Sequence, residues 1–480
     1  MKQIDWKIIY SKYDGIAKRA INLLSKEAGK YLIRENGVYK IHVLPCEKEG
    51  CEVSKNAFFV GLYNESKTIK KYVKEDEIKK DGFLVKVIKN PDNEDGRFVF
   101  LTAHSEQELF YAVVSFFDDY TPEKAPFGGS NRMPDLVFDS PLAEYSYSEA
   151  ADHRTRSIFT WGHSISDYRK YIDNMARSKF NELVLWNDFI PLNISEIIDY
   201  AHSYGIKVIL GYSWGWKEIG SKTDYITDES IEKVKKLAVN DYCENYAKVN
   251  CDGIYFQSFT ERKEHVVGGK TIARVVTDMV NEVAEKLWEI TPDLRLIFGL
   301  HASSVRDRLD EIARVNPKIE ILWEDCGEFP YSYSSFVTSE EKFNETLDFT
   351  KKLLNLRNGI GVGLVFKGLM MLDWNIFIYQ SGPYVMGEND ALISEHDKKV
   401  RANAWRMFSA DWMKYGEYVT KLLKFISENK KGEVNMCLAG TFDGGIYLPY
   451  ALCAQMYRTL DDSFVDTLHK VSRRACITVD

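Results

Sequence analysis

The chain has 480 residues, of which 45% are hydrophobic and 28% are charged, so it has the composition of a globular protein rather than of a disordered polymer. Its 63 basic and 71 acidic residues leave a net charge of −8, which argues against a nucleic-acid-binding surface and against an anionic membrane as partner. No stretch approaches the roughly 18 apolar residues of a membrane span, and the first residues lack the apolar segment of a signal peptide. Eight scattered cysteines show neither zinc spacing nor a disulfide framework, so we expect a cytoplasmic protein with no metal and no cofactor.

The first 135 residues are predicted to form a separate α/β domain. An amphipathic helix is expected at 16–24, and a second helix is expected after Ser105, whose side chain can cap it together with Glu108. Short strands are expected at 39–44, 57–62, 83–88 and 98–101. The segment Tyr120–Phe138 is rich in proline and glycine, as expected for a linker. Nothing in this part has the spacing of a catalytic group, so we interpret 1–135 as an accessory domain.

After the linker, strand-like runs alternate with helical patterns. Seven strands are expected at 157–161, 182–186, 207–212, 253–258, 295–299, 319–323 and 361–366, and helices at 166–178, 194–204, 230–249, 273–288, 305–315 and 340–354. This repetition is typical of a parallel sheet that closes into a (β/α)8 barrel. We expect the eighth strand at 377–385 and assign the barrel to 140–393.

The pattern becomes helical after the predicted barrel. A long amphipathic helix is expected at 398–429, with shorter ones at 448–457 and 462–471. We interpret 394–480 as a C-terminal helical domain. The predicted architecture is therefore an α/β protein, a TIM barrel with an N-terminal α/β accessory domain and a C-terminal helical domain.

Aromatic, amide and charged side chains gather just after the predicted strands, where the active sites of this fold lie. A single tryptophan or histidine is more often part of a core, but such residues after most of the strands are hard to explain by packing alone, since charged residues are rarely buried unpaired. Flat aromatic rings also stack on the apolar faces of sugar rings. The candidates for substrate binding are Trp161, His163, Trp186, Asn187, Trp214, Trp216, Gln257, His301, Trp323, Lys367 and Trp374.

Glu261 is the candidate general acid. It follows the apolar run Gly253–Ser258 and Phe259, and an apolar pocket raises the pKa of a carboxyl group so that it keeps a proton near neutral pH. Glycoside hydrolysis needs a second carboxyl group on the other side of the scissile oxygen. The candidates for this ionised group are Glu324, Asp325 and Asp373. The alternative role for each of these four acids is a helix N-cap or a salt bridge at the rim of the barrel.

The chain resembles the α-glucuronidase-type glycoside hydrolases of families 67 and 115 over nearly its whole length, in motifs rather than in close identity. The matching segments are Arg156–His163, Asp167–Arg177, Asn181–Asp188, Asp252–Glu261, Gly445–Leu452 and Val471–Arg474. The N-terminal part is similar to the α/β domain that precedes the barrel in β-hexosaminidases of family 20 and in α-glucuronidases. The resemblance implies a general acid at Glu261, a base after strand six or seven, and inversion at the anomeric carbon.

This sequence differs from the families it resembles at two points. Hexosaminidases carry an adjacent Asp-Glu pair after strand four, where this chain has Thr260 and Glu261, so the residue that would orient a substrate acetamide is missing. A clear clamp for a uronate carboxylate is also not visible. Lys367, Arg154 and Arg156 are candidates for such a clamp and, equally, for structural roles.

We therefore expect an exo-acting, inverting glycoside hydrolase that removes a terminal sugar, with a uronic acid as one candidate. The alternatives are a retaining β-hexosaminidase-like enzyme and a carbohydrate-binding barrel without catalysis. The expected partner is a carbohydrate substrate rather than a nucleic acid or a membrane, and the oligomeric state stays open, with a homodimer as one alternative. A second carboxylate opposite Glu261 would favour hydrolysis, and its absence would favour binding alone.

Overall fold

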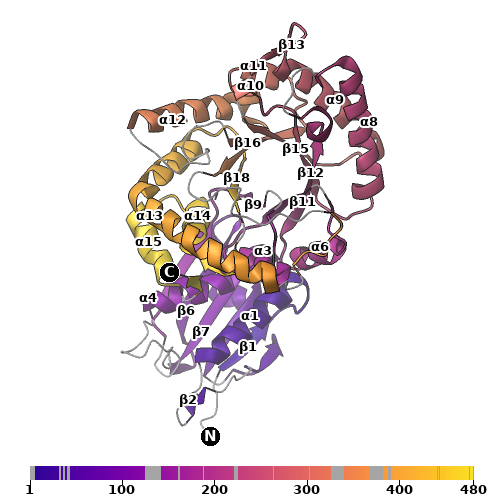
Figure 1. Ribbon diagram of the computed structural model, residues 1–480. Coiled ribbons are helices and arrows are strands. Elements are labelled where there is room, and N and C mark those ends of the chain that lie inside the picture. Colours follow the sequence, from indigo (N-terminus) through magenta and orange to yellow (C-terminus); the bar gives the residue numbers. More distant parts are fainter. Residues whose placement is uncertain are drawn as a thin grey trace. The chain divides into compact units, whose positions relative to one another are not determined.

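The structure is a computed structural model, and its described residues fall into two compact units (Figure 1). It describes residues 6–478 except 32–33, 36–37, 40–43, 54, 125–141, 161–162, 188, 221–224, 263, 302, 326–339, 368–381, 388–390, 441, 443 and 475. The first unit takes its described residues from Met1–Ala151, Ser203–Gly205 and Asp466–Ile477. The second takes them from Asp152–His202, Ile206–Val465 and Thr478–Asp480.

The first unit is built on a six-stranded mixed sheet with the strand order β4-β1-β5-β7-β6-β8. The strands are β1 (Trp6–Tyr10), β4 (Cys46–Lys48), β5 (Asn56–Leu62), β6 (Gly82–Asn90), β7 (Asn93–Ala103) and β8 (Tyr145–Ala150), and the short strands β2 (Arg34–Glu35) and β3 (Val38–Tyr39) pair separately. Strands β4, β1, β5 and β7 run parallel, whereas β6 is antiparallel to β7 and to β8. The predicted α/β character of this region is confirmed.

Helices cover both faces of this sheet. They are α1 (Gly15–Tyr31), α2 (Lys67–Tyr72), α3 (Glu106–Ser115) and α4 (Thr121–Lys124). Helices α1 and α3 pack against each other, and α3 packs on β6 and β7. Ile69 of α2 joins the aromatic core on the opposite face, where the rings of Phe59 and Phe100 stack with centroids 5.1 Å apart. Ser105 caps α3 as predicted, since its hydroxyl accepts a hydrogen bond from the backbone N–H of Glu108.

The second unit contains a closed barrel of eight parallel strands, as predicted. In chain order they are β9 (Arg156–Phe159), β10 (Glu182–Trp186), β11 (Lys207–Trp214), β12 (Gly253–Ser258), β15 (Leu296–His301), β16 (Ile319–Asp325), β17 (Val362–Phe366) and β18 (Val434–Ala439). Each strand pairs in parallel with the next, and β18 pairs with β9 to close the ring.

The helices of the second unit surround these strands (Figure 1). They are α5 (Tyr168–Arg177), α6 (Ile194–His202), α7 (Trp216–Ile219), α8 (Asp228–Asp241), α9 (Ile272–Ile290), α10 (Ser303–Arg306), α11 (Leu309–Ile312), α12 (Glu340–Asn355), α13 (Ala391–Asn429) and α14 (Leu448–Arg458). Helix α15 (Phe464–Ser472) follows, and its residues from Asp466 onward belong to the first unit. A short hairpin, β13 (Val266–Val267) and β14 (Lys270–Thr271), precedes α9. Across the parts of the chain that the structure describes, no helix combines the length and the apolar character needed to span a membrane.

The eighth barrel strand is not where the sequence analysis placed it. The predicted segment 377–385 lies partly outside the described residues, and its described part, 382–385, is not a strand. The barrel closes instead through β18, which inserts between β17 and β9. The sequence analysis missed β18 because this short apolar strand follows the long helix α13. The surrounding sequence has a helical pattern, so the strand was not recognised.

The predicted domain boundaries change accordingly. The boundary expected at residue 393 falls inside the barrel unit, because β18 comes after it. Strand β8 had been assigned to the barrel domain that begins at 140, but it pairs with β6 and so belongs to the mixed sheet. The segment predicted as a separate helical domain, 394–480, is divided between the two units.

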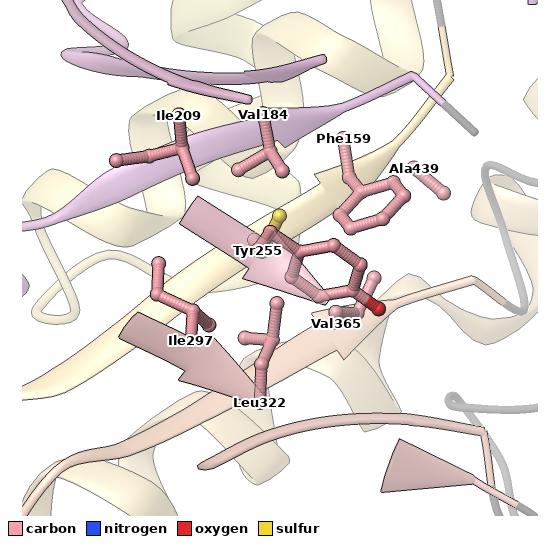
Figure 2. Close-up of a cluster of buried hydrophobic side chains, with 9 residues drawn as sticks. Phe159, Val184, Ile209, Tyr255, Ile297, Leu322, Val365 and Ala439 are labelled. Carbon is pink, nitrogen blue, oxygen red and sulfur yellow. The ribbon is translucent and has the colours of Figure 1, made fainter. Parts of the chain in front are cut away.

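Side chains at every second position of the barrel strands point to its interior, as the two-residue period of a strand requires. Figure 2 shows how those of the middle layer converge from the strands around them. This layer consists of Phe159, Val184, Ile209, Tyr255, Ile297, Leu322, Val365, Cys437 and Ala439, all of them buried. It separates a polar network at the amino ends of the strands from the polar groups at their carboxyl ends.

The network at the amino ends is centred on the buried carboxylate of Glu182. Its Oε1 accepts hydrogen bonds from Ser157 Oγ at 2.8 Å and from Asn435 Nδ2 at 3.0 Å. Its Oε2 forms an ion pair with the guanidinium of Arg295, which also pairs with Glu320. Because Ser157 lies on β9 and Asn435 on β18, this carboxylate ties together the two strands that close the barrel.

We expect Glu182→Gln to lower the free energy of unfolding by about 3 kcal/mol, because breaking a buried ion pair leaves its partner uncompensated. Arg295 keeps its pair with Glu320, which places the loss at the lower end of the range for such changes. The measurement is urea denaturation, with Glu289→Gln on the exposed face of α9 as the matched control, which should change stability by less than about 0.5 kcal/mol. Equal stability of the two variants would contradict the assigned role of Glu182.

Candidate active site

A buried carboxylate, that of Glu324, lies at the centre of the polar groups at the carboxyl end of the barrel. Its side chain is completely inaccessible to solvent. Gln257 Nε2 donates to both of its oxygens, at 2.8 Å and 2.7 Å. The ammonium of Lys367, which is also fully buried, lies 3.8 Å from Oε2. A buried charge needs such partners, because removing an ion from water is costly unless opposite charge and hydrogen bonds replace the water.

Strand alternation explains why these residues meet. Gln257, Glu324 and Lys367 each lie two positions after a residue of the middle layer, so their side chains point to the same interior. The prediction that Gln257, Glu324 and Lys367 gather at one end of the barrel is consistent with this geometry.

His301 lies between two carboxylates. Its Nδ1 is 3.5 Å from Glu324 Oε2, and its Nε2 is 3.4 Å from Glu261 Oε2. The imidazole is nearly buried, with 12% of its side chain exposed, whereas 55% of the Glu261 side chain is exposed. The two candidate catalytic carboxylates therefore face each other across a single ring, with Glu261 on the solvent side.

The pKa of Glu261 is lowered, not raised as the sequence analysis expected. The hydrogen bond from His301 is the largest cause, and the charges of His301 and Lys367 act in the same direction. Partial burial raises the pKa but does not outweigh these effects. The expectation overlooked the charge partners, which come from strands far away in the sequence. These contacts therefore favour the ionised form of the Glu261 carboxyl group.

The loop that carries Glu261 is anchored from two sides. Arg262 is buried, and its guanidinium donates to the backbone oxygens of Phe259 and Gly220. Ser304 Oγ of α10 donates to the backbone oxygen of Thr260. Glu261 thus projects from a fixed turn of backbone despite its exposure.

Tyr255 and Gly299 belong to the site, although the sequence analysis did not select them. A Cβ atom at Gly299 would overlap both Tyr255 Oη and Glu324 Oε1, so these two oxygens meet in the space that the missing side chain leaves. Tyr255 is fully buried, and its hydroxyl has no hydrogen-bond partner among the described residues. A glycine inside a strand is the signal that was available, because it often marks a close approach of other groups.

Trp186 extends the site away from the carboxylates. Its ring meets that of Tyr255 edge to face, with centroids 5.3 Å apart. It lines a small pocket with two other predicted residues, His163 and Asn187, and with Thr160 and Phe189, which were not predicted. The ammonium group of Lys217 lies over the exposed aromatic ring of Phe189.

Three predicted tryptophans do not lie in this arrangement. Trp214 is fully buried on the outer face of β11 and stacks on Phe256, with ring centroids 3.6 Å apart. Trp323 is fully buried on the outer face of β16, against Phe349 of α12. Both occupy the layer between strands and helices, since they are one position out of phase with the interior residues. Trp216 is 37% exposed at the start of α7.

Of the proposed uronate clamps, Arg156 has a structural role. Its guanidinium is buried and donates to the backbone oxygens of His153, Arg154 and Lys179 near the amino end of β9. Trp161, Asp373 and Trp374 lie outside the described residues, and of Asp325 only the backbone, paired with His301, is described. Among the side chains that the structure describes, no group of three or more His, Cys, Asp or Glu residues is arranged to hold a metal ion.

Known proteins resemble this chain in structure and at low sequence identity. No family model matches the sequence, and no curated protein matches it. The chain is similar to the GH20 β-N-acetylhexosaminidase from Streptomyces coelicolor A3(2), with 11% identity and a TM-score of 0.48, over 97% of this chain and 86% of that one. It is also similar to CpGH84D, with 13% identity and a TM-score of 0.44, over 78% of this chain and only 57% of the length of CpGH84D. Likeness at this level carries no argument about activity.

We expect Gly299→Ala to destabilise the barrel by about 1–3 kcal/mol, because the added methyl group displaces Tyr255 or Glu324 from a tightly packed interior. Thermal denaturation measures the change. Gly444→Ala is the matched control, since the nearest atom to its added Cβ, Tyr447 Oη, is 3.4 Å away. If the two variants unfold at the same temperature, the close approach of Tyr255 and Glu324 at Gly299 is not present in solution.

Proposed function

We propose that the protein is an exo-acting glycoside hydrolase in which Glu261 passes a proton to the leaving oxygen and a second carboxylate activates water. One observation carries this proposal: Glu261 and Glu324 face each other across His301 at the carboxyl end of a (β/α)8 barrel. Active sites of this fold lie at that end. Paired carboxyl groups are the usual machinery of glycoside hydrolysis.

The separation of the two carboxylates is compatible with both mechanisms. Because both contacts are made to one imidazole ring, Glu261 Oε2 and Glu324 Oε2 are at most about 9 Å apart, a bound that includes the roughly 6.5–9.5 Å of inverting enzymes and the roughly 5–5.5 Å of retaining ones. Inversion is proposed because Thr260 stands where a hexosaminidase carries the Asp that assists retention. A second carboxylate opposite Glu261 also favours hydrolysis over a barrel that only binds sugars.

The state of Glu324 suits a base. Both of its oxygens accept from the Gln257 amide and one lies near the Lys367 ammonium, which favours the ionised form. The Glu324 side chain is fully covered, so this role requires that substrate binding admits a water beside it. Asp373 and Asp325 stay as further candidates for the base.

The surroundings supply contacts for part of a sugar. Trp186 lies edge to face with Tyr255, and with His163, Asn187 and Thr160 it lines a small pocket that can take a polar group of a sugar but not the whole ring. Lys367, a candidate clamp for a uronate, already compensates the charge of Glu324, which argues against that role. A uronic acid stays the first terminal sugar to test only because the sequence resembles α-glucuronidases.

The test is a screen of aryl glycosides, with uronides and hexosaminides included, followed by Glu261→Gln. We expect wild-type protein to release the aglycone from one of them and the variant to lose about 10²–10⁴-fold in kcat, the usual contribution of acid–base catalysis. Glu264→Gln, an exposed acid on the same loop, is the matched control and should keep wild-type activity. Full activity of Glu261→Gln would remove Glu261 from the mechanism.

The configuration of the first sugar released separates the two enzymatic alternatives. Proton NMR during the first minutes of hydrolysis should show the anomer opposite to that of the substrate. The retained anomer would instead favour the hexosaminidase-like mechanism. Tight sugar binding without turnover would favour the non-catalytic barrel.

A further inference from the structure

The small pocket beside Trp186 contains a buried hydroxyl group that no other described residue binds. Tyr384 is only 8% exposed, and its Oη has no hydrogen-bond partner among the described residues. Its side chain lines the pocket together with Trp186. Buried polar groups in folded proteins are nearly always hydrogen-bonded, because burial without a partner is costly. An open hydroxyl in the wall of a pocket therefore indicates that a ligand supplies the partner.

The backbone at Tyr384 is anchored, so the position of its side chain is defined. The backbone N–H of Leu192 donates to the backbone oxygen of Tyr384 at 2.8 Å. The side chain of Asn193 binds the backbone of Met386 twice, accepting from its N–H at 2.9 Å and donating to its oxygen at 3.0 Å. These three bonds connect the segment 384–386, which follows β17, to the loop between β10 and α6. The open hydroxyl thus belongs to a segment that is held in place.

The described walls of the pocket define the chemistry of the group that fits it. Tyr384, Thr160 and Asn187 supply hydroxyl and amide groups. Much of the remaining wall is apolar and comes from Leu185, Ile190, Leu210 and Met386. A carboxylate would need a cation there, since a buried charge is costly unless it is paired, and the described lining residues include no lysine or arginine. These walls suit an uncharged group that combines an apolar carbon with a hydroxyl.

We propose that this pocket receives the exocyclic hydroxymethyl group of a terminal hexopyranose, with Tyr384 Oη donating to its oxygen. The proposal rests on the function proposed above and deepens it, because it names the class of terminal sugar. A hydroxymethyl group has two non-hydrogen atoms, of which the carbon suits the apolar walls and the oxygen suits Tyr384. An acetamido group has four, which is large for this small pocket. A pentose has no such group to place there, and a uronic acid brings a carboxylate instead.

Aromatic rings connect this pocket to the proposed catalytic groups. Trp186 lines the pocket and also meets Tyr255 edge to face, with ring centroids 5.3 Å apart. The hydroxyl of Tyr255 lies beside Glu324 Oε1 in the space that Gly299 leaves. A sugar that places its hydroxymethyl group in the pocket therefore has its ring near Trp186, on the side of the carboxylates. Tyr384 determines specificity in this arrangement and takes no part in breaking the glycosidic bond.

The test compares Tyr384→Phe with wild type on 4-nitrophenyl glycosides that share one ring configuration. Each set contains a hexoside, the pentoside that lacks the hydroxymethyl group, the uronide and the N-acetylhexosaminide. Glucoside with xyloside and galactoside with arabinopyranoside are two such pairs of hexoside and pentoside. We expect wild type to prefer the hexoside, and the variant to lose about 3–10-fold in kcat/KM on it, the effect of one hydrogen bond between uncharged groups, but less than about twofold on the pentoside.

Three outcomes of this comparison would overturn the proposal. Equal losses on the hexoside and the pentoside would show that Tyr384 does not bind the hydroxymethyl group. A loss confined to the N-acetylhexosaminide would assign the pocket to an acetamido group. A wild-type preference for the uronide would show that the terminal sugar is charged.

A stability measurement distinguishes an open hydroxyl from a structural one. Tyr384→Phe should not lower the midpoint of urea denaturation, because it removes no hydrogen bond made within the described chain. Tyr242→Phe is the matched control, since Tyr242 is also buried but its hydroxyl donates to Thr291 Oγ1 at 2.8 Å. The control should lower the midpoint and leave the ratio of hexoside to pentoside activity unchanged. A fall with Tyr384→Phe as large as that with Tyr242→Phe would show a structural role and overturn the proposal.

Binding of free sugars separates failure of this proposal from failure of the proposed function. Ligand-observed NMR with glucose, xylose, galactose and arabinose measures binding without hydrolysis. If wild type hydrolyses no glycoside but binds a hexose better than its pentose, and Tyr384→Phe removes the difference, the pocket is established and the hydrolase function fails. If wild type hydrolyses hexosides and Tyr384→Phe keeps the full preference, the hydrolase function stands and the pocket assignment fails. A wild type that neither binds nor hydrolyses any of these sugars would overturn both.

Discussion

The arrangement at the carboxyl end of the barrel depends on one constraint, the burial of the Glu324 carboxylate. A fully covered anion is tolerated only where other groups replace the lost water, and here Gln257, Lys367 and His301 do so. These partners come from β12, β15 and the end of β17. Because all three must lie close to the buried carboxylate of Glu324, they fix the positions of these three strands relative to β16. Because Gly299 has no side chain, the carboxylate of Glu324 and the hydroxyl of Tyr255 can both lie beside it.

Two of the groups that surround Glu324, His301 and Lys367, also change the pKa of Glu261. This residue is half exposed, and its partial burial alone would raise its pKa. The hydrogen bond from His301, together with the charges of His301 and Lys367, lowers the pKa instead.

The sequence predicted the features that depend on local periodicity. Seven barrel strands, most helices and the cap at Ser105 were found, because each follows from a pattern within a few residues. The strand β18 was missed because it follows α13, and its place depends on pairing with β9. Trp214 and Trp323 were placed in the site although they are out of phase with the interior residues of their own strands, Ile209 and Leu322, a mismatch that alternation alone could have revealed. The lowered pKa of Glu261 could not be predicted, since it depends on contacts across strands.

The most direct test of the account is a crystal structure of Glu261→Gln with an uncleaved glycoside, using the aryl glycoside that wild type hydrolyses best. We predict that the glycosidic oxygen lies within hydrogen-bonding distance of the side chain at position 261, with the sugar ring against Trp186 and an unbroken contact from position 261 to His301. A sugar bound elsewhere on the chain, or one whose glycosidic oxygen points away from position 261, would contradict it.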